Sequence, residues 1–98
     1  MQTYVGLDQE ANGGMTAIGR IIRDAWVFGL LPEGEMCAGR SAADLQILFD
    51  RVHAAWEPYG QLPSRLPREL AERHGRIHAQ AIEQARARGW SAELGDDD

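Results

Sequence analysis

Two histidines four residues apart are the strongest candidates for chemistry in this chain. His74 and His78 have the spacing that places side chains on one side of an α-helix, and the neighbouring residues on that side are apolar. Two imidazoles in this arrangement can chelate zinc, iron or copper, and His53 is a candidate third ligand. The residues therefore offer a possible metal site made of His74, His78 and His53.

A simpler interpretation of the pair needs no metal. Histidines on an apolar face are commonly half-buried and hydrogen-bonded to a carbonyl, a hydroxyl or a carboxylate. The pair lacks the intervening glutamate of the HExxH zinc motif, and two-ligand spacing on one helix often arises by chance. We favour this structural interpretation. Neutral histidines in the core would have lowered pKa values, so acidification would cost stability.

The single cysteine does not complete a catalytic set. Cys37 precedes a predicted helix whose dipole would favour a thiolate, but only His53 is available as a base and no cationic residue adjoins the thiol in sequence. The chain also lacks a calcium loop, a phosphate-binding glycine loop and a nucleophile elbow. We therefore expect a non-enzymatic protein without a resident cofactor. Because one cysteine cannot form an internal disulfide, we expect a reducing, cytoplasmic location.

The elements that position these residues form an all-α fold. Apolar residues at three- and four-residue intervals predict helices over approximately residues 8–29, 41–57 and 67–88. Asp8 and Asn12 are candidate caps for the first of these helices. The three helices are expected to pack around one core as a compact bundle, either antiparallel or orthogonal.

The two ends of the chain are predicted to be peripheral to this core. Residues 1–7 favour an extended arm, but no later segment has the pattern of a partner strand. Residues 91–98 form an acidic tail. Residues 1–98 are therefore expected to make a single domain.

Length and charge exclude several classes of protein. The chain has 98 residues and a net charge of −5, and no apolar run approaches the roughly 18 residues of a membrane span. Residues 58–90 carry a charge of +3, whereas residues 1–57 and 91–98 carry −4 each. Nucleic-acid binding normally requires a coherent basic surface. The acidic flanks argue against such binding. Nucleic-acid binding through the arginine-rich face of the third predicted helix is therefore kept only as the third hypothesis.

Several apolar residues exceed the needs of a three-helix core. Ile47 lies on the polar face of the second predicted helix, and further apolar residues follow the first helix and occupy the proline-rich connection. The leading hypothesis is therefore a small accessory protein that binds a protein partner or forms a homodimer. The second hypothesis is a metal- or small-ligand-binding bundle. The predicted interaction surface consists of Phe28, Leu30, Leu31, Met36, Ile47, Tyr59 and Leu62.

Overall fold

Three α-helices and three short 3-10 turns make up the computed structural model, which describes residues 3–10 and 14–90. No β-strand occurs among these residues, and the predicted all-α, three-helix class is confirmed. None of the helices in the described ranges is both long enough and apolar enough to cross a membrane. The predicted acidic tail lies outside the described residues. The elements are η1 (Leu7–Gln9), α1 (Ala17–Val27), α2 (Ala42–Trp56), η3 (Glu57–Tyr59), η4 (Pro63–Arg65) and α3 (Arg68–Ala87).

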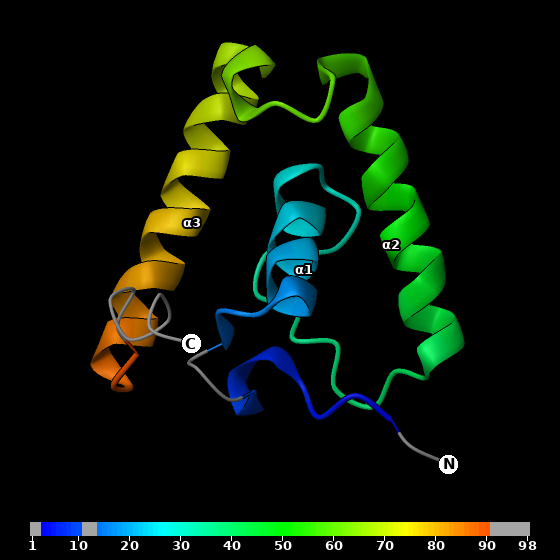
Figure 1. The fold of residues 1–98 in the computed structure, drawn as a ribbon, viewed down its shortest axis with the longest axis vertical. Coiled ribbons are helices and arrows are strands. Elements are labelled where there is room, and N and C mark those ends of the chain that lie inside the picture. The colour runs from blue at the N-terminus through cyan, green and yellow to red at the C-terminus, as the bar shows by residue number, and fades with distance from the viewer. Residues whose placement is uncertain (1–2, 11–13, 91–98) are drawn as a thin grey trace.

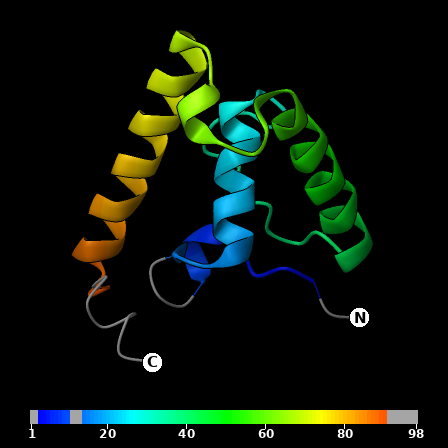
Figure 2. The same ribbon diagram turned by 45° about the horizontal axis from the view of Figure 1, so that its top comes forward.

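The short helix α1 is the common partner of the two longer helices. It packs against both α2 and α3, whereas α2 and α3 diverge from the ends that η3 and η4 connect (Figure 1). The turned view shows the same divergence, with α1 between the two longer helices (Figure 2). The arrangement therefore differs from a bundle in which every pair of helices is in contact along its length.

The predicted start of the first helix at residue 8 is wrong. α1 begins at Ala17, and the Thr16 hydroxyl caps it by accepting the Gly19 N–H at 3.0 Å. Gly14 has a φ of +81°, a conformation that cannot continue a right-handed helix. Asp8 lies in η1 and makes no cap to α1, and the other candidate cap, Asn12, lies outside the described residues. The other two helices agree with prediction to within one residue at each end.

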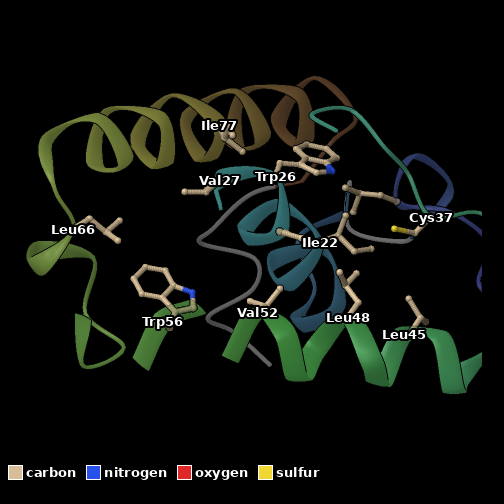
Figure 3. Close-up of a cluster of buried hydrophobic side chains, with 12 residues drawn as sticks. Ile22, Trp26, Val27, Cys37, Leu45, Leu48, Val52, Trp56, Leu66 and Ile77 are labelled. Carbon is tan, nitrogen blue, oxygen red and sulfur yellow. The ribbon is translucent and has the colours of Figure 1, made fainter. Parts of the chain in front are cut away.

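The core lies where α1 meets its two neighbours (Figure 3). Ile22 and Val27 of α1 are completely buried, and each burial contributes about 1.5–3 kcal/mol of transfer free energy. Ile77 is the large buried residue of α3, whose other buried positions, Ala81 and Ala85, are small. The small side chains allow α3 to approach α1 closely. The buried apolar residues of α2 are Leu45, Leu48, Val52 and Trp56.

The described part of the predicted arm, residues 3–7, is hydrogen-bonded to the loop before α2 and contributes Leu7 to the core. The Tyr4 N–H donates to the Arg40 carbonyl at 2.8 Å, and the Gly39 N–H donates to the Tyr4 carbonyl at 2.8 Å. The Leu7 N–H donates to the Met36 carbonyl at 2.9 Å, and the Leu7 side chain is buried. These residues thus pair with an irregular loop, residues 36–40. Such a loop lacks the alternating apolar pattern of a strand, so the sequence did not reveal it as a partner.

Candidate metal centre

A buried carboxylate connects all three helices. Asp24 of α1 is only 4% exposed. Its Oδ1 lies 2.9 Å from Nε2 of His78 on α3, and its Oδ2 accepts the indole N–H of Trp56, at the end of α2, at 3.2 Å. Burying an isolated carboxylate is costly, and the contacts with Trp56 and His78 offset this cost for Asp24.

His74 completes the cluster from the same face of α3. Its ring centroid lies 4.4 Å from that of His78 and 5.9 Å from that of Trp56, with an edge-on geometry to the indole. Burial lowers the pKa of His74, and the charges of His78 and Arg20 lower it further, against an opposing effect of Asp24. The lowered pKa favours the uncharged imidazole, which is the form that binds metal ions.

Three potential ligand atoms lie close together in the cluster. Asp24, His74 and His78 each offer a ligand atom, and these three atoms lie within 4.8 Å of one another. Bonds of about 2.0–2.2 Å to a central ion place neighbouring ligand atoms about 3–3.5 Å apart. The Asp24–His78 distance of 2.9 Å is already close to that range. The wider separations in the group, which reach up to 4.8 Å, would have to shorten for all three atoms to bind one ion.

The predicted third ligand, His53, is not part of this group. His53 is exposed on α2, and the place that sequence reasoning assigned to it is taken by Asp24. The sequence contained one signal for Asp24. It is an acidic residue inside the otherwise largely apolar stretch of residues 21–28. A carboxylate in such a stretch must either reach solvent or find partners in the core.

His53 instead lines a groove of about 560 Å³ between α1 and α2. Asp24 and Trp56 belong both to the wall of this groove and to the histidine cluster. The cluster therefore adjoins this groove. The remaining lining residues are Ala17, Arg20, Ile21, Phe49, Asp50, Val52 and Gln61.

The predicted interaction surface divides into two parts. Ile47 and Leu62 are 60% and 47% exposed, as a contact surface requires. Phe28 packs edge-on against Trp56 with ring centroids 5.0 Å apart, and it stacks on Tyr59 at 6.3 Å. Five of the seven predicted residues are thus partly buried rather than fully exposed. The predicted residues that pack against the core are Phe28, Leu30, Leu31, Met36 and Tyr59.

Other candidate groups lie away from the cluster. Cys37 is completely buried, and burial raises the pKa of its thiol, which opposes formation of a reactive thiolate. On α3, Arg76 makes a two-pronged ion pair with Glu33 at 2.7 and 2.8 Å. Part of the arginine-rich face is therefore neutralised within the molecule.

The chemistry available at the cluster is that of a mixed nitrogen and oxygen donor set. Two imidazoles and one carboxylate suit zinc and iron, and three protein ligands leave at least one coordination position for water or another molecule. Trp56 and the groove wall would shield one side of such an ion. Comparisons of the chain with protein-family models, with curated proteins and with solved structures found no match.

Proposed function

We propose that this protein binds one divalent transition-metal ion through Asp24, His74 and His78. The observation that carries the proposal is the convergence of these three ligand atoms, within 4.8 Å of one another, from two different helices. Zinc and ferrous iron are the ions that best suit two imidazoles and one carboxylate. Bound metal would add a cross-link between α1 and α3, and it would stabilise the fold by mass action.

The hydrogen bonds of the cluster support this role. Trp56 holds one oxygen of Asp24, so the carboxylate is oriented before any ion binds. The other oxygen lies 2.9 Å from Nε2 of His78, and an ion bound between them would replace this direct contact. Because imidazoles and carboxylates bind metal only in their deprotonated forms, metal binding should weaken as the pH falls.

Calorimetric titration with Zn²⁺ after removal of bound metal by a chelator tests the proposal. The parent protein should bind one equivalent, and His74→Ala and His78→Ala should each weaken binding at least tenfold because each removes a ligand. His53→Ala is the matched control, since His53 is exposed and lies outside the three-ligand group. It should leave the affinity unchanged. Absence of stoichiometric binding, or equal loss in all three folded variants, would contradict the proposal.

A role in binding another protein, or a second copy of this chain, is the second candidate. The specific observation in its favour is Ile47, a large apolar side chain that is 60% exposed on a helix. Neither candidate role requires catalysis, and both are compatible with a cytoplasmic location in which the single cysteine stays reduced. Nucleic-acid binding has less support, because Arg68 and Arg76 are ion-paired with Glu72 and Glu33.

A further inference from the structure

Two adjoining clefts lie between α1 and the second half of α3, away from the histidine cluster. Their volumes are about 320 and 220 Å³, and both are lined by Arg23, Trp26, Met36 and Gln84. Trp26 and Ile77, which are labelled in Figure 3, both line the smaller cleft. The exposed lining of the larger cleft is mainly apolar. The larger volume is at the lower end of the range of small-molecule sites.

Arg23 is the unusual member of this lining. Its residue surface is only 6% exposed, although arginine is rarely buried without a charged partner. Nη1 donates to the Gly14 carbonyl at 2.9 Å and lies 3.8 Å from the sulfur of Met15. Within residues 3–10 and 14–90, no carboxylate oxygen lies within 4.0 Å of this guanidinium.

Glu10 does not form an ion pair with Arg23 within 4.0 Å in the described part of the chain. Glu10 acts on Arg23 electrostatically, but its carboxylate accepts the Thr16 hydroxyl at 2.8 Å. Burial is the largest influence on Arg23 and lowers its pKa. A guanidinium has five N–H donors in a planar fork, and only Nη1 has a partner among the described residues. Among the described residues, Arg23 is thus a largely buried cation with one hydrogen-bonded nitrogen, beside a mainly apolar cleft.

We propose that these clefts bind a small organic monocarboxylate, with its carboxylate on Arg23 and its apolar body against Trp26 and Met36. The guanidinium fork matches a carboxylate in shape and charge. Arg88 adds a second positive charge to the lining of the larger cleft, whereas Asp8 adds a negative one. Glu33, which is paired with Arg76, lines the smaller cleft. This balance of charges favours a monoanion over a dianion or a phosphate. The site shares no residue with the proposed metal ligands, so either proposal can fail without the other.

Titration of the ¹⁵N-labelled full chain with sodium hexanoate, in the presence of a metal chelator, tests this site. The indole N–H of Trp26, which donates to the Glu35 carbonyl at 3.0 Å, is the reporter inside the clefts. Trp56 is the internal control on the opposite side of the core. Hexanoate should give saturable shifts at Trp26 and at the side-chain amide of Gln84. The neutral analogue 1-hexanol should bind at least tenfold more weakly because it lacks the charge.

Three variants separate binding from folding. Arg23→Gln should abolish the preference for hexanoate over hexanol if the variant folds. Since Arg23 also holds the Gly14 carbonyl, Ala87→Phe is the second variant, because it places a ring in the larger cleft from an exposed position near the end of α3. Ala79→Phe, also exposed on α3 but outside both clefts, is its control.

Ala87→Phe should weaken hexanoate binding at least tenfold, and Ala79→Phe should leave it unchanged. Three results would overturn the proposal: equal binding of hexanoate and hexanol, unchanged binding in Ala87→Phe, or no saturable shift at millimolar hexanoate.

Discussion

Replacing Trp56 with phenylalanine tests whether Asp24 holds the three helices together. The indole of Trp56 is buried and donates to Oδ2 of Asp24 at 3.2 Å. Phenylalanine keeps an aromatic ring beside Phe28 and His74 but removes the donor. The carboxylate is then left with the single partner His78 at 2.9 Å.

The expected cost follows from the charge of the acceptor. A hydrogen bond to a charged group contributes about 1.5–3 kcal/mol, and the smaller ring also buries less apolar surface. We expect the free energy of unfolding to fall by about 2–3 kcal/mol. A domain of this size has a total stability of about 5–15 kcal/mol, so the variant should fold. A loss of 2 kcal/mol corresponds to a decrease in Tm of about 8–16 °C.

Trp26→Phe is the matched control for this measurement by urea unfolding. Trp26 is similarly buried, but its indole donates to a neutral acceptor, the Glu35 carbonyl, at 3.0 Å. A neutral hydrogen bond contributes about 0.5–1.5 kcal/mol, so Trp26→Phe should cost about 1 kcal/mol less than Trp56→Phe. In the Asp24→Asn variant the acceptor is no longer charged. Trp56→Phe should therefore lower the free energy of unfolding by less in that variant than in the parent protein. Two results would refute the reasoning. One is an equal loss of unfolding free energy in Trp56→Phe and Trp26→Phe, and the other is a loss for Trp56→Phe that is the same with and without Asp24→Asn.

Four further predictions test other parts of the structure. The free energy of unfolding should decrease as the pH falls below 6.5, because the lowered pKa of His74 makes the unfolded state bind more protons; a flat profile between pH 7.5 and 5 would contradict the neutral, half-buried imidazole. In thermal melts, Gly75→Ala should stabilise by about 0.5–1 kcal/mol, because a Cβ there meets nothing within 4 Å in the middle of α3. Gly19→Ala should lower the melting temperature despite the same gain in helix propensity, because its Cβ would overlap the Gly14 carbonyl. If both glycine replacements stabilised the protein, the close contact at Gly19 would be contradicted. Ile47→Asp should change stability by less than about 0.5 kcal/mol and weaken any dimer detected by light scattering, whereas a parent protein that is monomeric from micromolar to millimolar concentration would exclude self-association. The buried Cys37 should react with a thiol reagent only as fast as the protein opens, so rapid labelling under native conditions would show that the thiol is accessible.

A helix boundary was predicted accurately where the residues that set it are adjacent in the sequence. Ser41 accepts the Asp44 N–H at 3.2 Å, and this cap is readable from four consecutive residues, so the start of α2 was predictable. The start of α1 was not, because the apolar spacing continues through residues that fold differently. There the close approach of Gly19 to the Gly14 carbonyl depends on how the preceding loop folds back. Periodicity contains no information about such a contact.

The partial burial of several predicted interaction residues could not be foreseen for a related reason. Helix periodicity assigns Phe28 to the edge of its helix, but it does not show that Trp56 and Tyr59 lie beside that edge in space. Ile47 was correctly expected to be exposed, because its exposure depends only on its position on α2. Exposure that depends on one helix was predictable, and exposure that depends on a neighbouring element was not.

One part of the candidate site was predictable from the sequence, and the other part was not. The joint position of His74 and His78 on one face of α3 follows from helix geometry alone, because residues four apart lie one above the other. The arrival of Asp24, 54 residues from His78 and 32 residues from Trp56, depends on α1 packing between the two longer helices. Helix geometry is set by the local backbone, whereas the meeting of distant side chains is set by the burial of three apolar faces in one core.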